Sequence, residues 1–250
     1  MKRVDELSLG WRTELIFPAF DGLVEQRGDH LLVRTPHNPT FWWGNYLLFD
    51  RAPVEGEAAR WLAMFDEEIA RVQPESRHVT FGIDAPHAVT RPRDFADAGL
   101  SLCSLTVLVM RREQLRSSSR PLPSGFRIRP LRLPEEAAIA AEQQVAADEG
   151  DKEPVSYRMF RERQMLRYGA MHAAGLGRFQ FVSTHPQFRR RGLCTALIHA
   201  VCRHGFDTLG LQDLVILADP ADVAIRLYES LGFVREGGIW QLERRPVEDR

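Results

Sequence analysis

The strongest constraint on the fold is an order of apolar segments that the chain contains twice. In each half a strand-like segment leads to an amphipathic segment of helical period, then to a short apolar run, a second helix and a final strand. The corresponding segments are residues 43–50, 56–72, 78–84 and 91–110 in the first half, and 178–184, 192–206, 213–219 and 223–245 in the second. In both halves about 22 residues separate the start of the first helix from the next strand, which predicts a tandem duplication.

The two halves are separated by the polar sequence RREQLRSSSRPLPSG at residues 111–125, whose Ser, Pro and Gly content is typical of a linker. A chain of 250 residues can bury a full core, either as one large domain or as two smaller ones. We therefore predict a first domain at residues 1–112, a linker at 113–124 and a second domain at 125–250.

The first helix of each half begins with a different charge. In the second half, Gly192 follows three arginines, and the apolar residues after it predict an inward helical stripe of Leu193, Ala196, Leu197, Ala200 and Val201. A helix start carries unpaired N–H groups and partial positive charge, so arginines there indicate a bound anion. The corresponding helix of the first half begins with Glu55 and Glu57, so we expect it to need no ligand.

Composition excludes several other classes of protein. With 33 Lys and Arg against 34 Asp and Glu, the net charge is −1, which gives no general attraction to nucleic acid or to an anionic membrane. No apolar run approaches the ~20 residues of a membrane span, and the first residues lack the apolar core of a signal peptide. The three cysteines are an odd number. We expect a soluble cytoplasmic protein with reduced thiols.

The second half resembles the GNAT superfamily of acyl-CoA N-acyltransferases. The resemblance rests on a strand ending in VSTHP, the sequence FRRRGLCTALI, and AIRLYESLGF after a buried strand. The family motif [RQ]-x-x-G-x-[GA] falls on Arg189, Arg190, Arg191, Gly192, Leu193 and Cys194. By this resemblance, the loop from Arg189 to Thr195 binds the pyrophosphate of coenzyme A, and the backbone of Val182, Ser183 and Thr184 binds its pantetheine arm.

The resemblance also implies the fold. It predicts an α/β protein of two GNAT-like halves, each a mixed, mostly antiparallel sheet flanked by helices, with a degenerate first half that lacks the cofactor loop. The second half departs from the family at Cys194, where Gly or Ala is usual, and at Ala221, where Asn is common. The sequence before residue 178 leaves no room for the family's two-stranded hairpin, so either the hairpin is deleted or the sequence omits residues, and we expect an omission.

The predicted reaction is direct attack of an amine on the thioester of acetyl-CoA. Tyr228 is the candidate proton donor for the leaving thiolate, because Ala224, Leu227, Tyr228 and Leu231 form one helical stripe and the resemblance places this tyrosine at the cofactor. The alternative is an ordinary core tyrosine with its hydroxyl bonded to backbone. Phe95 occupies the corresponding position of the first half. The general base is not identified: Asp219 and Glu149 are candidates, and the acidic residues Asp148, Glu149, Asp151 and Glu153 suit a cationic acceptor.

We thus expect an acetyl-CoA-dependent N-acetyltransferase whose acceptor is a small-molecule amine or a protein amine. The alternative is a non-catalytic acyl-CoA-binding or assembly module. A homodimer is possible, whereas partnership with nucleic acid or membrane is not expected. His199, Cys202 and His204 do not share one helical face, so we expect no metal.

Overall fold

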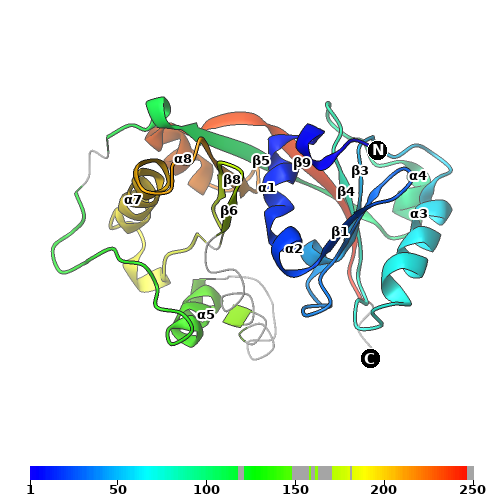
Figure 1. The fold of residues 1–250 in the computed structure, drawn as a ribbon, viewed down its shortest axis with the longest axis horizontal. Coiled ribbons are helices and arrows are strands. Elements are labelled where there is room, and N and C mark those ends of the chain that lie inside the picture. The colour runs from blue at the N-terminus through cyan, green and yellow to red at the C-terminus, as the bar shows by residue number, and fades with distance from the viewer. Residues whose placement is uncertain (118–120, 148–157, 159–160, 163–170, 181, 247–250) are drawn as a thin grey trace. The chain divides into compact units, whose positions relative to one another are not determined.

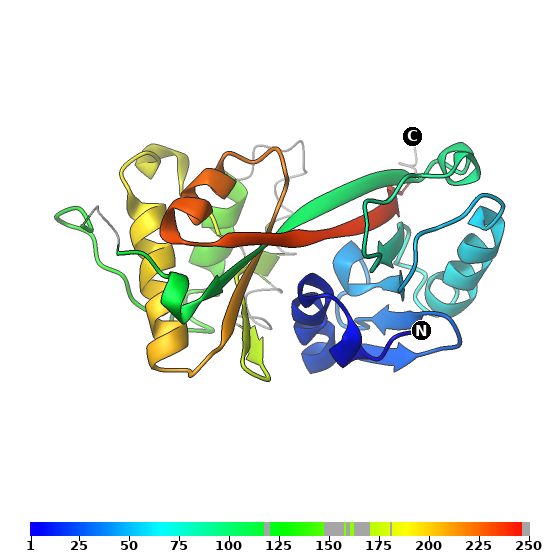
Figure 2. The ribbon, with the colours of Figure 1, turned by 90° about the horizontal axis from the view of Figure 1, so that it is seen from above.

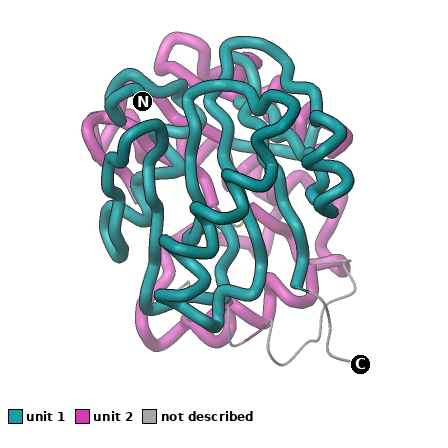
Figure 3. The backbone as a smooth tube through the Cα atoms, turned by 90° about the vertical axis from the view of Figure 1, so that its right-hand side faces the viewer, with its two compact units in different colours: residues 1–107, 217–220, 236–250 teal, residues 108–216, 221–235 magenta. Residues whose placement is uncertain are grey.

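A computed structural model describes the chain except residues 118–120, 148–157, 159–160, 163–170, 181 and 247–250. Contacts between Cα atoms divide the chain into two compact units (Figure 3). Unit 1 contains residues 1–107, 217–220 and 236–250, and unit 2 contains residues 108–216 and 221–235. Helices flank mixed, mostly antiparallel sheets (Figure 1), which confirms the predicted fold class.

Unit 1 is built mainly from the first half of the chain. Its helices and strands are η1 (Val4–Glu6), α1 (Leu9–Glu14), α2 (Ile16–Asp21), β1 (Leu23–Gln26), β2 (Leu31–Arg34), η2 (Trp42–Gly44), β3 (Tyr46–Phe49), α3 (Ala58–Phe65) with its π-helical extension η3 (Asp66–Ala70), β4 (Val79–Ile83), α4 (Arg93–Asp97) and most of β5 (Ser101–Arg111). Strands β1, β2 and β3 pair antiparallel, and β3 pairs parallel with β4. Every strand predicted for this half is present, whereas β1, β2 and the two N-terminal helices are additional.

Aromatic side chains fill the core of unit 1. The Phe49 and Trp61 rings stack with centroids 3.7 Å apart, and Phe95 packs edge-on against Trp61 at 5.2 Å. All three side chains are fully buried. Phe95, the counterpart of Tyr228, is therefore part of a dry core.

Unit 2 contains the second set of repeated segments. Its elements are η4 (Arg112–Gln114), α5 (Ala137–Ala147), β6 (Met171–Ala173), β7 (Leu176–Arg178), η5 (Pro186–Phe188), α7 (Leu193–Asp207), most of β8 (Asp213–Ala218), α8 (Ala224–Leu231) and the start of β9 (Val234–Arg244). Strand β7 pairs parallel with β8, as β3 does with β4 in unit 1. The sheet order here is β5-β8-β7-β6.

One expectation for unit 2 is wrong, and the expected omission of residues stays a prediction. Strands β6 and β7 form a tight antiparallel hairpin through Ala174 and Gly175, both at positive φ, so a strand does precede β7 within the printed sequence. The rest of the suspected gap, residues 163–170, lies outside the described residues. The strand expected over residues 178–184 ends at Arg178.

Helix α7 buries a different face from the one predicted. Its buried residues are Ile198, Cys202, Gly205 and Phe206, whereas Leu197 and Val201 of the predicted stripe are 37% and 40% exposed. Both stripes of this helix are apolar at helical spacing, so periodicity did not distinguish them. The buried stripe carries Phe206, the largest apolar side chain of the helix, whose burial removes more apolar surface from water.

The long strands β5 and β9 (Figure 2) each contribute residues to both compact units, and we refer to this sharing as the exchange of β5 and β9. In unit 1 the sheet order is β1-β2-β3-β4-β9-β5, and β9 pairs antiparallel with β4 from Val79↔Arg244 to Ile83↔Trp240. In unit 2 the end of β5 lies beside β8, where Arg111 Nε is 3.0 Å from Asp213 Oδ1. The compact units therefore do not coincide with the two repeats. The division of the sequence into a first domain at 1–112, a linker at 113–124 and a second domain at 125–250 stays a prediction.

Leu242 of β9 allows a test of this exchange. Its side chain is fully buried in the aromatic cluster of unit 1, opposite Phe81. Leu242→Ala should lower the free energy of unfolding by about 2–5 kcal/mol, because it leaves a cavity in that core. The control is Val234→Ala at the exposed start of the same strand, which should change it by about 0.5 kcal/mol or less. Equal losses in both variants, measured by denaturant unfolding, contradict the placement of β9.

Candidate functional site

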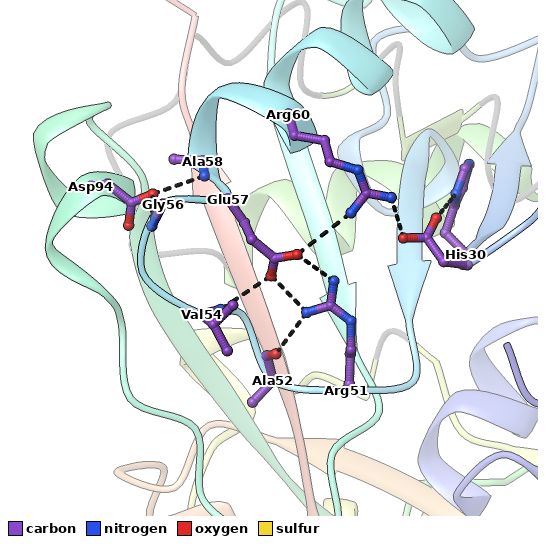
Figure 4. Close-up of polar contacts among 10 residues, drawn as sticks. His30, Arg51, Ala52, Val54, Gly56, Glu57, Ala58, Arg60 and Asp94 are labelled. Carbon is purple, nitrogen blue, oxygen red and sulfur yellow. Dashed lines mark hydrogen bonds and ion pairs between the residues drawn. The ribbon is translucent and has the colours of Figure 1, made fainter.

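The start of α3 in unit 1 is closed by a carboxylate of the same unit. Asp94 Oδ2, at the start of α4, accepts hydrogen bonds from Gly56 N at 3.0 Å and Ala58 N at 2.9 Å (Figure 4). In return, Glu55 accepts hydrogen bonds from the backbone N–H groups of Arg93 and Asp94. The two helix starts therefore cap each other, and no external anion is needed at α3.

Glu57 was expected to supply negative charge to the start of α3, but its carboxylate pairs with arginine side chains instead. Its carboxylate forms a two-pronged ion pair with Arg51, with N–O distances of 2.6 and 2.5 Å, and lies 3.5 Å from Arg60 (Figure 4). The Arg51 guanidinium holds the pKa of Glu57 below its ordinary value. Glu55 likewise caps α4 rather than α3. The expectation that α3 needs no ligand agrees with the structure, but the capping residue is Asp94.

The start of α7 has no such closure among the described residues. Its N-cap is Gly192 at φ +77°, no described side chain caps it, and its first turn contains no acidic residue. The first N–H groups of an α-helix have no acceptor within the helix. Glycine at this φ brings the backbone to the surface without strain, and the preceding Arg190 is also at positive φ, +61°. The predicted helix start is thus present, and its donors are available to a ligand.

The three arginines before this helix differ in their surroundings. Arg189 donates from Nε to Thr184 O at 3.2 Å and from Nη2 to Ala147 O at 3.1 Å. The Arg191 guanidinium lies 5.4 Å from the centre of the Phe188 ring. Within the described part of the chain, no carboxylate pairs with Arg190 or Arg191. Among the described residues, the charge of these two side chains therefore has no carboxylate partner at the start of α7.

Residues 182–184 lead from β7 toward this loop. The backbone ladder with β8 extends to Phe179, whose N–H donates to Val215 O at 2.9 Å, and residues 182–184 lie outside any strand. The Ser183 side chain is held by α5: it accepts from Gln144 Nε2 at 2.7 Å and donates to Gln143 Oε1 at 2.9 Å.

Tyr228 lies in α8 and is 5% exposed. Its ring packs against Phe233, and its hydroxyl has no hydrogen-bond partner among the described residues. The backbone bond of an ordinary core tyrosine is therefore not seen. Burial raises the pKa of the phenol, and the nearby Cys194 and Asp222 raise it further, so the group stays protonated at neutral pH.

Cys194 is half-buried in the first turn of α7. Burial raises the pKa of its thiol, while a hydrogen bond with Thr184 acts in the opposite direction. The side chain is thus a neutral thiol associated with Thr184 and close enough to Tyr228 to affect the phenol.

The other residues named from the sequence have the following locations. Asp219 is exposed after β8, and Ala221 is exposed before α8. Glu149, Asp148, Asp151 and Glu153 lie outside the described residues. Cys202 is fully buried, which raises the pKa of its thiol to about 12. In the described part of the chain, no group of His, Cys, Asp or Glu side chains could hold a metal ion.

Comparison with known proteins finds a family likeness in one segment of the chain. Residues 112–233 match the model of the acetyltransferase (GNAT) family. This segment of the chain is therefore similar to a GNAT domain. No curated protein matches the chain. None of the described helices is long and apolar enough to cross a membrane. That the first half is a degenerate GNAT copy stays a prediction.

Solved structures share the fold at low sequence identity. A functionally unknown conserved protein from Staphylococcus epidermidis has a TM-score of 0.68 and 13% identity, over 91% of this chain and 96% of its own. A GCN5-related N-acetyltransferase from Kribbella flavida has a TM-score of 0.63 and 15% identity, over 93% of both chains. One from Sphaerobacter thermophilus has a TM-score of 0.57 and 16% identity, over 95% of this chain and 87% of its own. These likenesses cover both halves and show the fold.

The first-half cap can be tested by mutation. Asp94→Ala removes the acceptor of two backbone N–H groups, so it should lower the free energy of unfolding by about 1–2 kcal/mol. Asp97→Ala on the same helix removes only an exposed ion pair with Arg93 and should cost about 0.5 kcal/mol or less. Denaturant unfolding of both variants measures the difference, and equal stability of the two would contradict a capping role for Asp94.

Proposed function

We propose that the GNAT-like domain catalyses acetyl-CoA-dependent N-acetyl transfer to an amine. The observation that carries the proposal is the difference between two equivalent helix starts. The start of α3 is closed by Asp94, whereas the start of α7 has no side-chain cap among the described residues and lies beside Arg190 and Arg191, which pair with no described carboxylate. Such a combination of free N–H groups, helix dipole and arginines is suited to a phosphate-bearing ligand.

The residues of the domain fit coenzyme A. The backbone from Arg190 to Thr195 would hold the pyrophosphate, with Gly192 permitting close approach. The backbone of Val182, Ser183 and Thr184, which lies outside any strand, would hold the pantetheine arm. The half-buried thiol of Cys194 bonds with Thr184, so the residue that departs from the family pattern already has a protein partner.

Tyr228 supplies the proton for the reaction. Acetyl-CoA provides an activated acyl group, and transfer requires a neutral amine and a proton for the departing thiolate. The Tyr228 hydroxyl has no described protein partner, and its raised pKa keeps it in the protonated, donating form. The acceptor class is an amine, either of a small molecule or of a protein.

A non-catalytic acyl-CoA-binding module is the alternative, favoured by Ala221 and Cys194, which depart from the family pattern. Incubation with acetyl-CoA and a panel of amines, with measurement of thiol release, separates the two. Amine-dependent release is expected for the enzyme. Tight binding of coenzyme A without release for any amine supports the alternative.

Binding at the arginine loop can be measured without an acceptor. At a hundredfold excess over its dissociation constant, coenzyme A should raise the free energy of unfolding by about 2.7 kcal/mol. Arg191→Glu should abolish this increase, since it places negative charge beside the phosphates. Arg203→Glu makes the same charge change near the other end of α7 and should preserve the increase. An unaltered increase in Arg191→Glu excludes the loop from the site.

The role of Tyr228 can be tested once an acceptor is found. Tyr228→Phe retains the ring and removes the proton donor, so kcat should fall at least ~10-fold while affinity for coenzyme A stays within about threefold. Tyr46→Phe, in the core of unit 1, is the control and should retain kcat. If Tyr228→Phe reacts at the wild-type rate, the thiolate obtains its proton elsewhere and the proposed role is wrong.

A further inference from the structure

We propose that Arg189 and Ser183 are positioning residues: they clamp helix α5 to the segment at residues 182–184 and so set the backbone that receives the pantetheine arm. The proposal rests on the proposed function for the identity of the ligand. It assigns Arg189, the first residue of the cofactor motif, a role other than phosphate binding.

The first part of the clamp is the Arg189 guanidinium. Its Nε and Nη2 donate to the carbonyls of Thr184 and Ala147, the last residue of α5. Arg189 thus joins the end of α5 to the end of the segment at residues 182–184.

The second part lies one turn earlier on α5. Gln143 and Gln144 hold the Ser183 hydroxyl from both sides, one as acceptor and one as donor. The Gln144 side chain is buried, so loss of the Ser183 hydroxyl would remove one hydrogen bond from a buried amide. The two contacts involve adjacent residues of the segment, Ser183 and Thr184, and together they restrain both its position and its rotation.

Among the described residues, α5 buries few large apolar side chains. Its other buried residues are Ala137 and Ala141, and its large apolar residue Ile139 is 66% exposed. Burial of alanine side chains removes little apolar surface from water, so the hydrogen bonds to Ser183 and Arg189 contribute to the attachment of α5. A movement of α5 is therefore expected to move residues 182–184, and a movement of residues 182–184 is expected to move α5.

The clamp can be tested in the free protein by hydrogen–deuterium exchange. Arg189→Lys keeps the charge but replaces the planar fork that bonds both carbonyls, and Ser183→Ala removes the hydroxyl between the glutamines. Each should accelerate amide exchange in residues 137–147. The control is Arg190→Lys, whose native side chain has no described partner and which should leave exchange in α5 unchanged. Unchanged exchange in both clamp variants overturns the proposal.

The positioning role is tested with two ligands. Coenzyme A carries both pyrophosphate and pantetheine arm, whereas adenosine diphosphate carries the pyrophosphate without the arm. In Arg189→Lys and in Ser183→Ala, affinity for coenzyme A should fall at least ~10-fold while affinity for adenosine diphosphate stays within about threefold.

A parallel loss of both affinities in Arg189→Lys identifies Arg189 as a phosphate ligand and overturns the proposal; unchanged affinity for coenzyme A overturns it as well. If the wild-type protein binds neither ligand, the proposed function fails, and the exchange measurement alone decides whether the clamp exists.

Discussion

Unpaired backbone N–H groups at helix starts are the constraint on which the organisation of this protein depends. The N–H groups at the start of α3 and at the start of α7, which are equivalent helices of the two halves, are treated differently. In the first half the carboxylate of Asp94, in α4, accepts hydrogen bonds from N–H groups at the start of α3. The carboxylate of Glu55 accepts hydrogen bonds from N–H groups at the start of α4. Alignment of FADAGL with YESLGF places Leu227 where the first half has Asp94. The second half thus has leucine where the first half has the capping carboxylate of Asp94. This difference accompanies the difference between α3, whose first N–H groups are capped, and α7, whose first N–H groups have no described side-chain cap.

Much of the fold could be predicted because its strands are strongly apolar and because residues such as glycine mark where its helices begin. Segments such as Val79–Ile83 and Asp213–Ala218 are largely apolar, and Gly192 marks the start of α7. The exchange of β5 and β9 could not be predicted, since both strands carry similar patterns and either could lie beside β4. The buried face of α7 was mistaken because the helix offers two apolar stripes.

The site was predictable only where its chemistry is local in sequence. The arginines, Gly192 and Cys194 are consecutive or nearly so, and the arrangement of free donors follows from the helix start. Asp94 bonds to residues 36 and 38 positions away, and the Ser183 partner Gln144 is 39 positions away. Such pairings depend on how distant segments pack, and hydrogen-bonding capacity alone does not identify the partner.

The exchange of β5 and β9 also sets an order of events during synthesis. Residues 101–107 of β5 emerge from the ribosome long before residues 236–244, yet in unit 1 β9 lies between β4 and β5. The sheet of the first unit therefore stays incomplete, with an unpaired edge on β4, until nearly all of the described chain has been made. Formation of its core depends on contacts of large sequence separation, which slows folding. During that interval the open edge is a place where a second nascent copy could insert its own strand.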